Sequence, residues 1–260
     1  MNITDKTLLR HIFHQDPHLY AYALGDLEPA MWSLSSFFGE MDADGTVLSL
    51  GLVWQGVTPP VLLLFGQPSP AFYDNFPNRV FYMLPDELLS GFEQVYETPH
   101  NIPLWRMKVL PTEFQPIANP PAGLQRLSGA DMGLVQQLFE QDGPRPEEIE
   151  AISASQIDSG VFFGIVENKQ LVAVAGSHVC STSESVGTVG YVYTRRQARE
   201  QGYATATTAA VTQTFFEMGI NTVILNVARH NTPAIRAYEK LGYTIHAALA
   251  EGYGNRWTSN

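Results

Sequence analysis

The chain has 260 residues, of which 45% are hydrophobic, and its 26 acidic and 15 basic residues give a formal net charge of -11. A chain of this length and composition can bury one large core or two small ones. Its acidic balance argues against nucleic acid or an anionic membrane surface as the main partner.

The N-terminus and the cysteine content suggest a cellular location. The first residues, Met1–Lys6, lack the basic and apolar regions of a signal peptide, and no apolar run approaches the roughly 20 residues that a membrane helix needs. Cys180 is the only cysteine, which excludes an intrachain disulfide and a cysteine-based metal site. We therefore expect a cytoplasmic protein without a membrane partner.

The first part of the chain alternates helix and strand patterns. We expect helices at residues 7–18, 24–34, 69–76 and 85–96. We expect a β-hairpin around Asp44-Gly45 with strands at 37–41 and 46–54, and further strands at 61–65, 80–83 and 102–110.

Three histidines near the first helix have a spacing that is compatible with metal binding. His11, His14 and His18 fall at positions i, i+3 and i+7. Pro17 interrupts the run, and no acidic partner is fixed on the same face. We therefore expect a solvated or partly buried helix face and no metal site.

A proline-rich segment separates two halves of the chain. Residues 111–122 carry four prolines and few core residues, which predicts a linker between domains at 1–110 and 123–260. In the second half we expect strands at 124–127, 161–167, 170–180, 186–194, 222–228 and 244–250. We expect a helix that starts at Ser128 or at Ala130-Asp131 and is broken by Gly143-Pro144-Arg145-Pro146. Further helices are expected at 147–157, from Gly202 to Gly219 and at 231–242, with a short polar tail at 252–260.

The stretch from Val189 to Thr205 predicts an anion site. A strand ends at Thr194, and Arg195, Arg196 and Arg199 follow within five positions of an otherwise acidic chain. A helix then begins at Gly202, where the first turn exposes backbone N–H groups that attract phosphate. The small Gly202 and Ala204 would let a pyrophosphate approach that backbone closely.

Two segments resemble the GCN5-related N-acetyltransferase (GNAT) family. Arg199-Glu200-Gln201-Gly202-Tyr203-Ala204 is similar to its motif A, Arg/Gln-x-x-Gly-x-Gly/Ala. Further along, motif B of the family, Asn-x-x-Ala-x-x-x-Tyr-x-x-x-Gly-Phe/Tyr, is matched at every position, by Asn231, Ala234, Tyr238, Gly242 and Tyr243. The resemblance covers the last half of the chain, from Gly123.

The resemblance implies that acetyl-CoA is bound as the acyl-donor cosubstrate, without a metal. It assigns the pantetheine arm to the strand end and to the start of the last helix, and the phosphates to the turn between strand and helix. The implied binding residues are Val192, Tyr193, Thr194, Arg199, Glu200, Gln201, Gly202, Tyr203, Ala204, Thr205, Asn231 and Ala234. For Asn231 a plain helix cap stays open as well.

The N-terminal half repeats the order of elements that the C-terminal half is expected to show. At the place of motif A it has Phe65-Gly66-Gln67-Pro68-Ser69-Pro70, with no arginine and with prolines that remove backbone donors. We predict an α/β fold with mixed sheets, built as tandem acetyltransferase-like domains of which the N-terminal one is degenerate. That half would be structural or would gate the substrate.

Acyl transfer from a thioester to an amine needs a proton for the departing thiolate. We predict Tyr238 as this general acid, against the alternative of a core aromatic whose hydroxyl is satisfied elsewhere. For the general base, His178 and Glu184 near the ends of adjacent strands are candidates, and the amine arriving deprotonated is the alternative. Cys180 is expected to be a packed thiol.

The predicted function is acyl-CoA-dependent N-acyltransfer, most simply of an acetyl group, to a primary amine by direct attack. The alternative is a non-catalytic acyl-CoA-binding regulatory protein. A weak resemblance to the FR47-like, glycine N-acyltransferase-like branch favours a small amine or an amino acid as acceptor, with a protein N-terminus left open. The oligomeric state is left open between monomer and homodimer.

Overall fold

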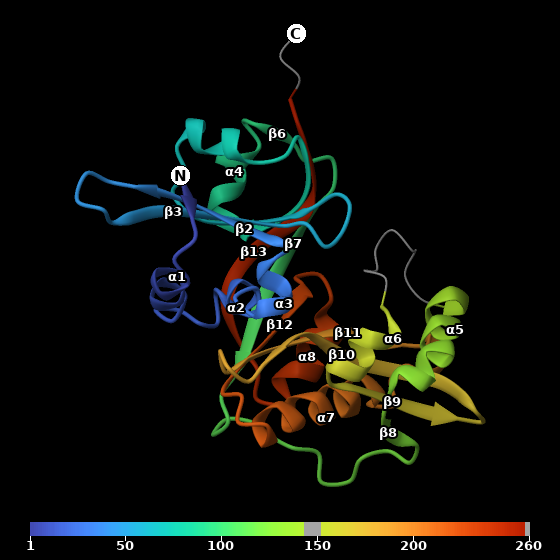
Figure 1. Cartoon of the computed structure of the whole chain (residues 1–260). Helices are drawn as coiled ribbons and strands as arrows, with labels where there is room; N and C mark the ends of the chain where they lie inside the picture. The colour runs from blue at the N-terminus through green and yellow to red at the C-terminus, as the bar shows by residue number, and fades with distance from the viewer. Residues whose placement is uncertain (143–151, 258–260) are drawn as a thin grey trace. The chain divides into compact units, whose positions relative to one another are not determined.

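The computed structural model describes residues 1–142 and 152–257 (Figure 1). Contacts divide the chain into two units: unit 1 is Met1–Arg106 with the residues from His246 onward, and unit 2 is Met107–Ile245. The predicted division at residues 110 and 123 differs from this at the C-terminus. The reason is that strand β13 (Thr244–Arg256) pairs antiparallel with β5 (Arg79–Pro85) of unit 1.

Unit 1 contains a mixed sheet in the order β1-β2-β3-β4-β5-β13. Besides β5 and β13, the strands in this order are β1 (Asn2–Ile3), β2 (Ser35–Met41), β3 (Val47–Trp54) and β4 (Val61–Gly66). Unit 1 also contains β6 (Tyr96–Glu97) and most of β7 (Asn101–Val109), which runs on into unit 2. The β4–β5 pair is parallel, and the other neighbours in this order are antiparallel.

The helices of unit 1 are short. They are α1 (Lys6–Phe13), α2 (Ala21–Gly25), α3 (Pro29–Trp32), the 3₁₀ segments η1 (Pro70–Asn75) and η2 (Asp86–Leu88), and α4 (Leu89–Phe92). Asp5 caps α1 by accepting from the backbone N–H groups of Thr7 and Leu8. The helix expected at residues 7–18 ends at Phe13, because the chain turns there and Pro17 prevents a longer helix.

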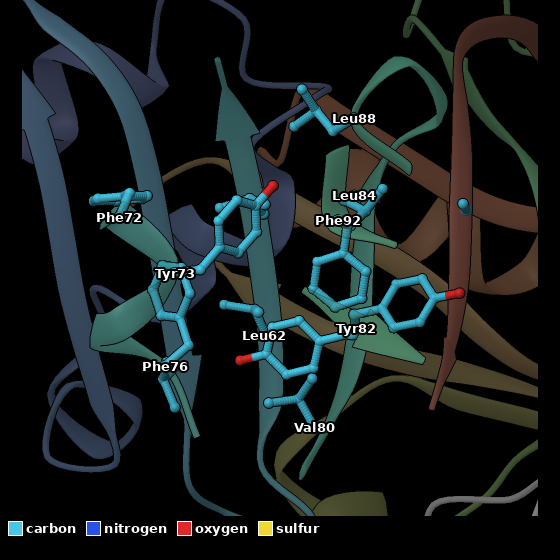
Figure 2. Close-up of a cluster of buried hydrophobic side chains, with 13 residues drawn as sticks. Leu62, Phe72, Tyr73, Phe76, Val80, Tyr82, Leu84, Leu88 and Phe92 are labelled. Carbon is cyan, nitrogen blue, oxygen red and sulfur yellow. The ribbon is translucent and has the colours of Figure 1, made fainter. Parts of the chain in front are cut away.

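The core of unit 1 lies between strand β5 and the short helical segments. Alternate residues of β5 point inward, and η1, η2 and α4 contribute aromatic and leucine side chains. Figure 2 shows these side chains, which include Leu62, Phe72, Tyr73, Phe76, Val80, Tyr82, Leu84, Leu88 and Phe92. The ring of Phe92 stacks on that of Tyr96, with centroids 4.5 Å apart.

The C-terminal residues were predicted to form a polar tail, and this prediction was wrong. Strand β13 continues through Gly252 to Arg256, and Gly252 lies opposite Tyr82 in the register with β5. A Cβ at Gly252 would come within 2.4 Å of the His100 carbonyl oxygen. The glycines that obscured a strand pattern in the sequence are therefore residues that let other chain segments approach closely.

In unit 2 the strands that follow β7 in the sheet lie in the order β12-β11-β10-β9-β8. The strands are β8 (Leu124–Arg126), β9 (Phe162–Glu167), β10 (Gln170–Ser181), β11 (Val186–Thr194) and β12 (Thr222–Ala228). The β11–β12 pair is parallel and the others are antiparallel. Helix α7 (Tyr203–Glu217) makes the crossover between the parallel strands.

The other helical segments of unit 2 are η3 (Gly129–Asp131), α5 (Met132–Asp142), α6 (Ala154–Ser159), η5 (Arg196–Ala198) and α8 (Thr232–Glu239). Val135, Leu138 and Ile157 of α5 and α6 join one buried cluster on the sheet, and Tyr203 and Ala206 of α7 join another. The predicted break at Gly143–Pro146 and the start of the helix at 147–157 lie outside the described residues.

The two units repeat one arrangement, which confirms the predicted fold class. In unit 2 the antiparallel strands β9, β10 and β11 lead into a parallel partner through α7. In unit 1 the antiparallel strands β2, β3 and β4 lead into the parallel partner β5 through η1. The crossover of unit 1 is six residues of 3₁₀ helix instead of a 15-residue α-helix.

The predicted linker packs within unit 2. It contains no helix or strand, but the backbone N–H of Gln115 donates to the Leu241 carbonyl at 3.0 Å, and Phe114 contacts Phe216 with ring centroids 5.5 Å apart. Gly242 ends helix α8 with a φ of +90°, and a Cβ there would lie 2.1 Å from the Glu113 carbonyl oxygen. Across residues 1–142 and 152–257, no helix combines the length and the apolar character that a membrane span requires.

Candidate functional site

Strands β11 and β12 pair along only part of their length. The parallel register runs from Val186 opposite Thr222 to Val189 opposite Leu225, yet β11 continues to Thr194 and β12 to Ala228. Beyond Val189 the edge of β11 that faces away from β10 has no register partner in β12. Backbone N–H and C=O groups on such an edge can bind an extended ligand as an added strand.

A β-bulge marks the start of this opening. Between two register pairs, β11 advances from Gly190 to Tyr193 while β10 advances only from Gly176 back to Val174. The additional residue is accommodated at Tyr191, whose φ is +51°. A bulky residue in the left-handed region is strained, and such strain is commonly found at ligand sites.

Aromatic packing holds the bulge in place. Tyr191 stacks on Phe162 with centroids 5.6 Å apart, and the exposed His178 ring meets it edge-on at 4.3 Å. Gly190 lies beneath that imidazole, and a Cβ at this position would come within 2.4 Å of the ring. The structure thus places His178 beside the opening.

Glu184 lies elsewhere. It is buried in the turn that precedes β11, where its backbone N–H donates to the Ser181 hydroxyl. Gly190 lies six positions further along the chain, and the strand from Val186 to Gly190 alone spans about 13 Å. The two base candidates therefore occupy opposite ends of the paired region, and Glu184 does not reach the opening. Cys180 is half-buried and unbridged.

The predicted segment Val192–Thr194 forms the edge of the opening. All three residues are half-buried, and Tyr193 and Thr194 pair on their other side with Val174 and Ala173 of β10. The Thr194 carbonyl accepts from Arg199 Nε at 3.3 Å, which ties the strand end to the turn that follows. That this segment holds a pantetheine arm stays a prediction.

The first turn of helix α7 is the candidate phosphate site. Gly202 caps the helix with a φ of +76°, and the first N–H bonded inside the helix is that of Ala206, which donates to the Gly202 carbonyl at 2.9 Å. By helix geometry, the backbone N–H groups of Tyr203, Ala204 and Thr205 have no acceptor within the helix. A Cβ at Gly202 would meet no atom within 4 Å, so the space before the helix is open.

The charged residues of the turn have different partners. Arg195 donates to the Gln170 side chain at 3.0 Å, whereas Arg199 is exposed, with its guanidinium carbon 6.0 Å from the centre of the Tyr193 ring. Glu200 and Gln201 are exposed, and Glu200 also has a positive φ, of +65°. Arg195, Arg196 and Arg199 all lie between the end of β11 and the start of α7, and Arg196 is exposed like Arg199.

Tyr203 contributes to the site through its backbone. Its side chain is buried and its hydroxyl donates a short hydrogen bond to Glu167 Oε1, which raises the pKa of the phenol. This bond fixes the first turn of α7 to the end of β9. Glu167 was not singled out from the sequence, because a single carboxylate at a strand end carries no distinguishing pattern.

Helix α8 supplies the remaining predicted residues. Asn231 Oδ1 accepts from the Ala234 backbone N–H at 3.3 Å, so the cap that the sequence left open is present. Tyr238 is 5% exposed, and burial raises the pKa of its phenol above the ordinary 10.0. Within the described residues its hydroxyl has no hydrogen-bond partner, whereas that of Tyr243 lies 2.6 Å from Thr212 Oγ1.

Comparison with known proteins gives one family match. Residues 133–243 match the model of the acetyltransferase (GNAT) family, a segment that includes β11, α7, β12 and α8. A search of curated proteins found no match.

Solved structures share the fold over nearly the whole chain. A GCN5-related N-acetyltransferase from Kribbella flavida is 18% identical with a TM-score of 0.59, and 95% of each chain is covered. A Drosophila protein is 11% identical with a TM-score of 0.72, covering 99% of this chain and 98% of that one. A tandem GNAT protein from the clavulanic acid biosynthesis pathway is 11% identical with a TM-score of 0.57, covering 100% and 99%.

Proposed function

We propose that this chain, whose residues 133–243 match the acetyltransferase (GNAT) family model, transfers an acetyl group from acetyl-CoA to a primary amine by direct attack. The observation that carries the proposal is that two features follow one another along the chain. Beyond Val189, β11 has no register partner in β12, and after the turn that contains η5 comes the open first turn of α7. A strand edge of this kind suits an extended chain, and the first turn of a helix suits a phosphate.

Each part of the site has a role in binding. The backbone N–H groups of Tyr203–Thr205 would hold the pyrophosphate, and Arg199 would add a charge-assisted bond to it. Backbone groups of Val192–Thr194 would hold the pantetheine arm along the strand edge. The glycine at 202 lets the phosphates approach the helix without a side chain between them.

A pantetheine arm bound along this strand edge would place the thioester beside the bulge, where the acyl transfer would take place. The amine adds to the thioester carbonyl, and the carbonyl oxygen becomes an oxyanion that a backbone N–H of the opened strand would stabilise. The C–S bond breaks, the thiolate takes a proton from the Tyr238 hydroxyl, and solvent then returns a proton to the phenolate. The amine loses its own proton to solvent or to a base at the opening, where His178 is exposed.

We further propose that the acceptor is a small amine or an amino acid, and that unit 1 does not bind acyl-CoA. Unit 1 has six residues of 3₁₀ helix, with Pro70 at its start, where unit 2 has α7. Such a segment offers no row of free N–H groups to a phosphate.

The charge reversal Arg199→Glu tests the phosphate site. A charge-assisted contact contributes about 1.5–3 kcal/mol, so its loss should raise the dissociation constant for CoA about tenfold to a hundredfold. The repulsion added by the charge reversal should raise this constant further. Arg126→Glu is a matched control, because Arg126 is also exposed and also donates to one backbone carbonyl, that of Gly160 at 3.2 Å. Equal affinity of the two variants in calorimetry would remove the phosphate site.

Thiol release from acetyl-CoA with a panel of amines tests the reaction itself. Turnover with at least one small amine or amino acid is expected. Thermal stabilisation by CoA with no turnover on any amine would instead indicate a regulator that binds acyl-CoA.

A further inference from the structure

We propose that unit 1 carries a divalent transition-metal site formed by Asp16, His18 and His246, and that zinc occupies it. These residues offer one carboxylate oxygen and two imidazole nitrogens, and the three ligand atoms all lie within 4.8 Å of one another. Zinc holds such atoms at about 2.0–2.2 Å, which places neighbouring ligands of a tetrahedral site roughly 3.3 Å apart. Small side-chain rotations would therefore bring the three atoms to a common ion.

The carboxylate is already oriented toward this point. His246 Nε2 lies 2.9 Å from Asp16 Oδ1 and 3.0 Å from Oδ2, and the His18 ring is next to that of His246 with centroids 5.3 Å apart. Asp16 Oδ1 also accepts from the Leu19 backbone N–H at 3.0 Å. Carboxylates that bind a metal typically also accept a hydrogen bond from the protein, because this bond fixes the orientation of the ligand.

Further contacts hold the turn that carries two of the ligands. The backbone N–H groups of Leu19 and Tyr20 both donate to the Asp16 carbonyl. The buried guanidinium of Arg106 donates to the Leu19 carbonyl. With Pro17 restricting the backbone between them, Asp16 and His18 are presented from a rigid turn.

The chemistry of this donor set favours a transition metal. Imidazole suits zinc, copper, iron and nickel, whereas calcium and magnesium prefer oxygen ligands. The Asp16 side chain is 38% exposed and that of His246 17%, so solvent reaches the site. Three protein ligands would leave a fourth position for water.

The position of the site in the chain suggests what the metal does. Asp16 and His246 are 230 residues apart, and His246 is the first residue of unit 1 after the chain leaves unit 2. A metal bound here joins the N-terminal and C-terminal segments of unit 1. Because it binds the folded state alone, it would raise the stability of that unit.

His18 lies apart from His11 and His14, the other two histidines near the first helix. Helix α1 ends at Phe13, so His18 lies beyond it and turns toward Asp16 and His246. His11 and His14 instead line a separate surface hollow together with Thr7, Arg10 and Gln15. They provide a matched control, because they are two nearby histidines at helical spacing outside the proposed site.

Titration of chelator-treated full-length protein with zinc chloride, followed by calorimetry, tests the proposal, and cobalt(II) absorption reports the ligand geometry. The wild type should bind one equivalent with a higher melting temperature, and Asp16→Asn and His246→Gln should each weaken binding at least tenfold. His11→Ala/His14→Ala should bind like the wild type. The absence of saturable binding, or its loss only in the His11→Ala/His14→Ala variant, would overturn the site. If His246→Gln does not fold, Asp16→Asn decides the result, since that carboxylate is partly exposed.

Discussion

Replacing Tyr238 by phenylalanine tests the proposed general acid, because a catalytic role predicts a loss of turnover with little change in stability. The substitution keeps the ring and removes only the hydroxyl, which has no hydrogen-bond partner among the described residues. A typical buried hydrogen bond contributes about 0.5–1.5 kcal/mol, so with none to lose the free energy of unfolding should change by less than about 0.5 kcal/mol. If the hydroxyl protonates the thiolate, the turnover number should fall about 10²–10⁴-fold with unchanged affinity for CoA.

Tyr243 provides the matched control. It is 1% exposed, and burial raises the pKa of its phenol as it does for Tyr238, but its hydroxyl is bonded to Thr212 Oγ1. Thr212 also donates to the Thr208 carbonyl, so Tyr243→Phe leaves the threonine with one partner. This variant should lose about 0.5–1.5 kcal/mol of stability and keep its turnover.

Steady-state thiol release, calorimetry with CoA and urea unfolding measure the three quantities on both variants. Because the pKa of Tyr238 lies above 10.0, the acid form is fully present at lower pH, and the wild type should show no loss of turnover from its ionisation below about pH 10. A Tyr238→Phe enzyme with wild-type turnover would refute the assignment and leave solvent as the proton source.

Two further predictions follow from the backbone and from a buried carboxyl group. Gly202→Ala and Gly219→Ala place a side chain at φ values of +76° and +80° at the two ends of α7, both in open space, so each should cost about 1–2 kcal/mol of stability. Only Gly202→Ala should weaken CoA binding in calorimetry, and equal CoA affinities of the two variants would contradict the phosphate site. Burial raises the pKa of Asp26 from 3.8 to about 8, so the folded state keeps a proton that the unfolded state releases, and stability should fall as pH rises from about 4 to 8. Asp26→Asn should remove that dependence, giving a larger stability advantage over the wild type at pH 8 than at pH 5 in urea unfolding, and a pH-independent difference would count against it.

The sequence by itself determined the local elements of the candidate site. The strand at 222–228, the helix that begins after Gly202 and ends before Gly219, and the Asn231 cap were predicted and are confirmed. These features depend on neighbours within a few residues: side-chain periodicity, a glycine that tolerates positive φ, and a side chain that bonds to a nearby N–H. The order of the two motifs was likewise readable, since it needs no knowledge of distant contacts.

Only the tertiary structure decided how distant segments combine. The point where β11 and β12 part, at Val189, depends on the register between two strands, and the bulge at Tyr191 depends on the pairing with β10. Neither leaves a local pattern, because a strand's side chains alternate in the same way whether or not its edge is paired.

The same reason explains the two largest differences from the sequence prediction. Thr244–Arg256 was read as a shorter strand and a polar tail because its glycines and polar residues carry no apolar period, yet pairing with β5 extends the strand. His18 was grouped with His11 and His14, which are close in sequence, but its contacts are with Asp16 and with His246 at the other end of the chain. Backbone pairing and side-chain contacts over such separations are fixed by the folded chain as a whole, so no local window of sequence contains them.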